Sequence, residues 1–111
     1  MRSTDDTHAD ARTRVGALKA HPEDNVAVAL RRLEPNDIPT FADGSLAPPL
    51  RDHVPLGHKF ALAEVPLGAP VIKFGQVIGH ATAEIEPGGH VHLHNLIGAS
   101  ARTHRREDRD D

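Results

Sequence analysis

The sequence contains no cysteine, tryptophan or tyrosine, and only 3 phenylalanines. Without cysteine the chain can form neither a disulfide framework nor a thiolate metal site, so any metal must be held by nitrogen and oxygen ligands. The shortage of aromatic rings, with a net charge of -3, argues against a general nucleic-acid binder, which needs a basic surface and usually stacking rings. No apolar run approaches the roughly 20 residues of a membrane helix, and the polar start lacks the apolar segment of a secretory signal. We therefore expect no nucleic-acid partner, no membrane contact and a cytoplasmic location.

The length of 111 residues leaves room for one small domain. Because only 38% of the residues are hydrophobic, the core must be small, and a partner surface would add to its stability. Residues 1–14 and 98–111 are rich in charge and poor in large apolar side chains, a composition typical of disordered segments. The ordered domain is therefore expected to span residues 15–97, between a disordered lead and a disordered charged tail.

Beyond Pro35 the chain is dense in proline and glycine, which end helices and leave short strands between turns. An apolar residue followed by a turn recurs at residues 54–57, 65–68 and 85–88. The segments around these units have lengths suited to strands of about 5 residues. They are residues 59–64, 70–74, 76–83 and 89–96, with a further short strand at 15–20. We predict a mostly β fold with sharp corners, where backbone freedom comes from Gly57, Gly68, Gly75, Gly79 and Gly88.

One short helix is predicted over residues 25–33. The apolar positions fall on one stripe of such a helix: Val26, Ala29, Leu30 and Leu33. Asp24 or Asn25 could cap its first turn, and Pro35 ends the pattern. The predicted fold class is therefore mostly β with one short helix.

Histidine is the unusual residue, at 9 in the chain, because imidazole is both a metal ligand and a proton carrier near neutral pH. The densest group is HVHLHN at residues 90–95. On a strand its 3 histidines would point one way, with Val91 and Leu93 in the core. Neighbouring rings would start about 7 Å apart at Cα, close enough for two to bind one ion. Further ligands could come from a partner chain or from His21, Asp24 or His58. The alternative is an ordinary solvated polar face on an edge strand.

His58 and Lys59 place an imidazole and a cation directly after a turn. Lys59 could bind a substrate carboxylate, and His58 could bind a metal or move a proton. The alternatives are an ordinary surface lysine and a hydrogen-bonded turn residue. Residues 87–92 also look like the opening of a cupin metal motif, but no glutamate follows within the expected few residues. The residues by themselves predict a small β-rich domain with a histidine-lined face.

Four segments in this order resemble the SAF-type domain of the altronate and galactarate dehydratase family. They are HPEDNVAVAL at residues 21–30, GHKFAL at 57–62, VIKFGQVIG at 71–79 and VHLHN at 91–95. The resemblance implies a β-clip fold, a compact and strongly bent β structure. In this family the domain occurs at the N-terminus of a long chain or as a small subunit beside a large one. A length of 111 residues fits the small subunit, as in altronate dehydratase or the related sulfolactate sulfo-lyase.

The resemblance also implies a lyase that removes water, or sulfite in the sulfo-lyase, from a 2-hydroxy acid. It implies a divalent metal shared with the large subunit, iron in the first place with manganese or zinc as alternatives. The small chain would close the active site of a large catalytic subunit in a hetero-oligomer, would be inactive alone, and would share a small sugar-acid substrate with it. The alternative is a SAF-like module that binds sugars or sugar acids without chemistry.

The site residues implied by the resemblance lie in the matching motifs. They are His21, His58 and Lys59 as catalytic groups, Asn25 and Asn95 as donors and acceptors for substrate hydroxyls, and His92 and His94 as metal ligands. Phe74 stands where the family favours tyrosine, so no phenol is available at that position. His90 lies outside the matching part of the motif and is not included in the predicted site.

Overall fold

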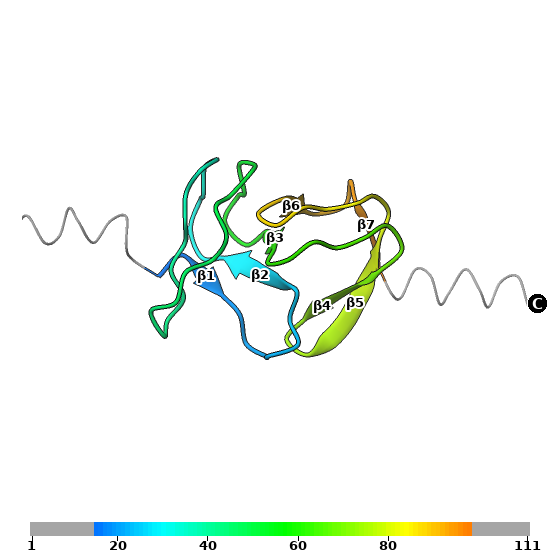
Figure 1. Ribbon diagram of the computed structural model, residues 1–111, viewed down its shortest axis with the longest axis horizontal. Helices are drawn as coiled ribbons and strands as arrows, with labels where there is room; N and C mark the ends of the chain where they lie inside the picture. Colours follow the sequence, from blue (N-terminus) through cyan, green and yellow to red (C-terminus); the bar gives the residue numbers. More distant parts are fainter. Residues whose placement is uncertain (1–14, 99–111) are drawn as a thin grey trace, which may run out of the picture.

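The computed structural model describes residues 15–98, and these residues form β structure without a helix (Figure 1). The strands are β1 (Ala17–Leu18), β2 (Val26–Ala29), β3 (Lys59–Ala61), β4 (Pro70–Lys73), β5 (Gln76–Ala81), β6 (His90–Val91) and β7 (Leu96–Gly98). The prediction of a mostly β fold is confirmed. The predicted disordered lead and tail lie outside the described residues, apart from Gly98 at the end of β7. Within residues 15–98 there is accordingly no helix long and apolar enough to cross a membrane.

The strands form two small antiparallel sheets. One has the order β1-β2-β3-β6 and the other the order β4-β5-β7. In Figure 1 the β4–β5 hairpin and β7 lie at one end of the molecule, and β1 lies with the loops of residues 30–57 at the other. Strands β3, β4 and β5 begin at the residues that the sequence predicts and end earlier, because the corners cut them short.

Two clusters of buried side chains form the core, one on each face of β2 and β3. The first gathers around Phe60 and includes Leu33, Leu50 and Val54 from the loops. The second lies between the two sheets and includes Val26, Ala61, Val71, Ala81 and Val91. Successive residues of a strand point to opposite faces, so β2 sends Val26 into one cluster and Ala27 into the other. The central strands are thus buried on both sides.

The predicted helix over residues 25–33 is wrong, because its first half is strand β2. Strand β2 is buried on both faces and is therefore apolar at every position. In such a short apolar run, the spacing of hydrophobic residues does not distinguish a helix from a buried strand. Antiparallel pairing with β1 and with β3 holds it extended. Leu30, which a helix would bury beside Leu33, is 43% exposed.

The sharp corners are copies of one turn. In each of the three predicted units a buried residue forms an isolated bridge, and the fourth residue is a glycine with φ between 83° and 85°. The carbonyl of the second residue accepts a hydrogen bond from the N–H three residues later, as in His58 N to Pro55 O at 3.0 Å. A further copy that the sequence pattern did not reveal spans residues 33–36, where Asn36 takes the glycine position with φ of 77°. Asparagine tolerates this region better than other side chains do.

The β4–β5 hairpin turns at Phe74 and Gly75, which have φ values of 55° and 79°. Two consecutive positive φ values are typical of a type I′ turn, whose twist matches that of the strands. A bulky residue such as Phe74 rarely adopts this conformation, so the turn carries backbone strain. Gly79 is required for another reason: a Cβ there would collide with the carbonyl oxygen of Ile97 on β7.

Candidate metal centre

Three histidines from two paired segments meet at the edge of the four-stranded sheet. His58 directly precedes β3, His90 opens β6, and His92 follows β6. The segments lie side by side because β3 pairs with β6 in a register that sets Phe60 opposite His90. One ring nitrogen from each histidine lies within 4.8 Å of the others. Two imidazole ligands of one ion stand about 3.0–3.4 Å apart for metal–nitrogen bonds of about 2.0–2.1 Å, so coordination by all three requires some of these side chains to move.

The three rings are in direct contact with one another. His58 Nδ1 and His90 Nε2 are 2.9 Å apart, a hydrogen bond in which one ring donates and the other accepts. The rings of His58 and His92 are stacked, with centroids 3.9 Å apart and an interplanar angle of 12°. The lone pair of an imidazole nitrogen lies in the plane of the ring. For His58 and His92 to bind one ion together, one of the two rings must therefore rotate about its Cβ–Cγ bond, a torsion with a broad range of allowed angles.

Burial disfavours the charged form of His90 and His92. The pKa of His90 is lowered to about 4, first by desolvation and then by the charges of His94, His58 and His92, against a small opposing effect of Asp52. Desolvation also lowers the pKa of His92, with help from His58, Lys59 and His94. Neutral imidazole is the form that binds metals.

His92 Nδ1 is buried and has no hydrogen-bond partner within the described part of the chain. Buried polar atoms of this kind are rare and call for an explanation such as a missing ion. A metal ion or a water molecule bound there would satisfy this nitrogen. The set of three closely spaced imidazole nitrogens therefore fits a divalent transition metal, for which imidazole is a suitable ligand.

Two further side chains hold the backbone of the cluster. Asn95 is buried; its Oδ1 accepts a hydrogen bond from His92 N at 2.9 Å, and its Nδ2 donates to His90 O at 2.8 Å. Asp52 accepts a hydrogen bond from His90 N at 2.9 Å. Outer groups that orient ligands in this way are a general feature of metal sites.

The predicted strand over residues 89–96 is wrong beyond Val91. The chain turns at residues 92–95, and Leu93, predicted in the core, is 82% exposed. The physical reason is the Asn95 side chain, which bonds to nearby backbone and so competes with strand pairing. His94 is exposed on this turn, with its ring 5.2 Å from that of His90 and outside the group of three nitrogens.

The two asparagines predicted to bind substrate hydroxyls are both engaged with backbone. Asn25 Oδ1 accepts a hydrogen bond from Ile72 N at 2.7 Å, and Asn25 Nδ2 donates to Pro70 O at 2.9 Å. This amide joins β2 to β4 and therefore links the two sheets. Asn95 is occupied in the turn of the histidine cluster.

His21 lies apart from the three clustered histidines. It is exposed, its Nδ1 accepts a hydrogen bond from Glu23 N at 3.0 Å, and its ring covers Gly75. The neighbouring Asp24 is buried and accepts hydrogen bonds from Ala20 N, His21 N and Gly75 N. Desolvation favours the neutral acid, but the backbone N–H groups together hold the pKa of Asp24 below its usual value. This carboxylate anchors the β4–β5 turn.

Lys59 is half-buried on β3, next to the cluster. Burial lowers the pKa of its ammonium group, and the charge of Lys73 on β4 lowers it further. The β3–β6 register sets Lys59 opposite Val91, the residue between His90 and His92. The charge of Lys59 also contributes to the lowered pKa of His92. Of the predicted site residues, the structure thus brings together His58, Lys59, His92 and, at the margin, His94.

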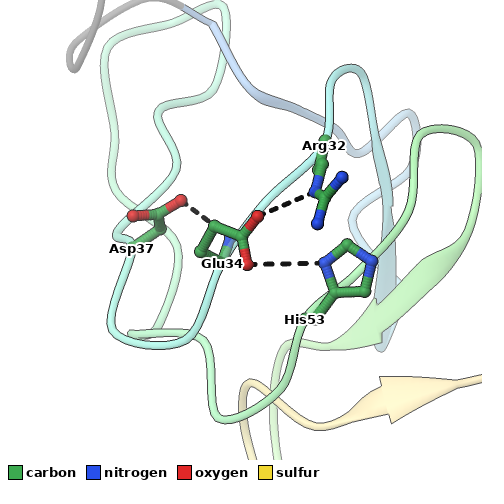
Figure 2. A network of polar contacts seen from close by, with 4 residues as sticks. All are labelled: Arg32, Glu34, Asp37 and His53. Atoms are coloured by element: carbon green, nitrogen blue, oxygen red, sulfur yellow. Dashed lines mark hydrogen bonds and ion pairs between the residues drawn. The ribbon is translucent and has the colours of Figure 1, made fainter.

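His90 is the cluster residue that the family motif leaves out. The signal for it is present in the sequence, because strand alternation already sets it on the same side as His92. His53, by contrast, belongs to an exposed polar network shown in Figure 2. Glu34 bridges His53 and Arg32: its Oε1 lies 3.5 Å from His53 Nδ1 and its Oε2 lies 2.8 Å from Arg32 Nε. Asp37 Oδ2 accepts a hydrogen bond from Glu34 N. Such surface pairs contribute little stability.

Comparison with known proteins gives a match over most of the described residues. The family model "Altronate/galactarate dehydratase SAF domain" matches residues 15–99. The chain is 46% identical over 78 residues to altronate dehydratase of Escherichia coli (strain K12), covering 70% of this chain and 15% of that protein. It is 37% identical over 71 residues to the galactarate dehydratase (L-threo-forming) of the same organism, covering 64% and 13%. It is 48% identical over 42 residues to (2R)-sulfolactate sulfo-lyase subunit alpha of Paracoccus pantotrophus, covering 38% and 63%. The chain therefore spans about 15% of the length of the altronate dehydratases that it matches.

Proposed function

This chain belongs to the altronate/galactarate dehydratase SAF domain family, and we propose that it is the metal-binding small subunit of a lyase that acts on a sugar acid. The observation that carries this proposal is the group of closely spaced imidazole nitrogens from His58, His90 and His92. Its relatives are named as dehydratases and as a sulfo-lyase subunit, which supports the reaction class.

A larger catalytic subunit is part of the proposal for three reasons. The SAF domain makes up only 15% of the altronate dehydratases, so most of such an enzyme lies outside it. The histidine cluster is also half-buried at the edge of a sheet, where a second chain could cover it and exclude water. The sulfo-lyase relatives, whose names mark them as alpha subunits, support a division of this kind.

Each residue has a proposed role in the loss of water from a 2,3-dihydroxy acid. A divalent metal held by His58, His90 and His92 would supply Lewis acidity toward the substrate carboxylate, with iron as the first candidate. Lys59 neutralises negative charge on the bound acid. His94, exposed beside the cluster, exchanges a proton with the substrate. The C2 proton and the C3 hydroxyl leave as water, and the resulting enol rearranges to the 2-keto acid.

The test is to co-express this chain with candidate large subunits and to assay the complex and each part. The substrates are altronate, galactarate and sulfolactate, and the readouts are 2-keto acid formation and bound metal. The proposal is supported if the complex is active and neither of its parts is active by itself. His90→Asn should remove both activity and metal, whereas His53→Asn, a histidine in the separate network of Figure 2, should change neither.

Two results would overturn it. An active complex that keeps its metal in the His90→Asn variant would show that the cluster is not the metal centre. A chain that binds no large subunit, yet holds a sugar acid without converting it, would be a non-catalytic binding module.

A further inference from the structure

An apolar groove lies beside strand β1, at the edge of the four-stranded sheet that is opposite to the histidines. The order β1-β2-β3-β6 places β1 at one edge and His90, on β6, at the other. The groove has a volume of about 720 Å³ and is lined by residues 15, 17–19, 30, 41–43, 45–48 and 62. A chain that covers the histidine cluster would therefore approach the sheet at the edge away from this groove.

Four large apolar side chains of the groove are exposed. They are Leu46 at 67%, Leu30 at 43%, Val15 at 42% and Leu18 at 40%. None of the four belongs to either core cluster or packs against one, so the fold of the single chain does not use them. Exposed apolar side chains that gather around one concave surface are typical of a contact with another protein.

The terminal segments of this chain do not supply an occupant for the groove. Among residues 1–14 and 99–111 the only large apolar side chain is that of Met1, and most of the others are charged or small. Charged side chains placed in an apolar groove would lose their hydration without gaining matching contacts. The occupant is therefore sought in a second chain.

The charges beside the groove favour a second copy of this chain. Lys19 and Asp43 both line the groove and carry opposite charges, and within residues 15–98 neither takes part in an ion pair. In a two-fold interface the same surface serves both copies, so residue i meets residue j and residue j meets residue i. One lysine and one aspartate on this surface would thus form two ion pairs. Two-fold dimers are also by far the commonest form of soluble oligomer.

We propose that two copies of this chain associate through the groove about a two-fold axis. Leu46 of each copy packs against the exposed apolar side chains of the other, and Lys19 of each copy faces Asp43 of the other. Ala17 on β1 is only 1% exposed, so the contact is made by side chains and not by pairing of β1 with its copy. This association is independent of the function proposed above, because it uses the other edge of the sheet.

Sedimentation equilibrium of the full chain, between about 1 and 100 µM, tests the association. The average mass should rise with concentration from 12.0 kDa toward twice that value. Leu46→Asp should weaken the dimer by about 100-fold or more, because it places a charge in the apolar contact twice per dimer. The matched control is Leu67→Asp, since Leu67 is 69% exposed and lies outside the groove; this variant should associate like the wild type. Circular dichroism checks that both variants are folded.

A charge exchange tests the two-fold arrangement. Lys19→Glu sets two carboxylates against each other at each rim contact and should weaken the dimer about 10-fold. The double variant Lys19→Glu/Asp43→Lys restores opposite charges at both contacts, so its affinity should return to within about 3-fold of the wild type.

A mass of 12.0 kDa at every concentration would overturn the proposal, and so would an equal loss of association in Leu46→Asp and Leu67→Asp. A dimer that the charge exchange fails to restore would overturn the two-fold pairing of Lys19 with Asp43. A chain that stays monomeric until a large subunit is added, and then needs Leu46 to bind it, would assign the groove to that subunit instead. Metal binding and lyase activity are measured separately, so a dimer without either would contradict only the proposed function.

Discussion

Removal of the Asn95 side chain should loosen the turn that carries two of the histidines proposed to bind a metal. The Asn95→Ala variant loses hydrogen bonds to His92 N and His90 O at 2.9 Å and 2.8 Å. A hydrogen bond contributes about 1 kcal/mol net, and a buried partner left without one costs about 1–3 kcal/mol. Because Asn95 is 9% exposed, water can reach these partners only in part. We expect the free energy of unfolding to fall by about 2–3 kcal/mol, and the melting temperature of this small domain by roughly 10–20 °C.

The same variant should bind metal more weakly, because the backbone that carries the rings of His90 and His92 is no longer held in place. Loss of an outer group that orients ligands typically lowers metal affinity by about 10–100-fold. Urea unfolding followed by circular dichroism measures the stability, and competition titration with Zn²⁺ measures the affinity. Leu93→Ala is the matched control, since Leu93 lies in the same turn and is 82% exposed. An Asn95→Ala chain that unfolds at the wild-type urea concentration would refute the role in the turn, and unchanged Zn²⁺ affinity would refute the role in positioning.

Three further predictions concern pH and packing. The pKa of His90 is lowered to about 4 in the folded chain, so between pH 6.5 and about 4 the unfolded chain binds more protons. Thermal stability should therefore decrease as the pH falls through this window, and above it His90 should have no effect on the pH dependence. The decrease of the melting temperature with falling pH should be less steep in His90→Asn. Equal pH dependence in the two proteins would contradict the burial of this imidazole. Gly79→Ala should lower the free energy of unfolding, measured in urea, by about 1–3 kcal/mol, because the new Cβ would collide with the carbonyl oxygen of Ile97. Gly44→Ala is the control: the new Cβ meets open space and only the φ is unfavourable, so the loss should be about 1 kcal/mol. Asp24→Asn should lower stability by about 2–3 kcal/mol, since an amide replaces a carboxylate that accepts several backbone N–H bonds; an unchanged unfolding midpoint would show that the carboxylate does not anchor the hairpin.

The sequence by itself was enough for the fold class and for the corners. Each corner needs an apolar anchor and a residue that tolerates positive φ, and these requirements are met within four neighbouring residues. The starts of β3 and β4 could be read for the same reason, since each follows such a corner, and the start of β5 follows the hairpin glycine Gly75. The corner at residues 33–36 is not evident from the sequence pattern, because Asn36 takes the glycine position there.

Only the tertiary structure decided how residues 25–33 fold and which histidines meet. Strand β2 is extended because partners on both sides pair with it, and its own residues carry no period that favours one conformation. His58 and His90 are 32 residues apart and come together through the register between β3 and β6, which no local pattern encodes. The local sequence thus determined the turns and the number of histidines. The pairing of strands that are distant in the sequence determined which of these histidines share a site.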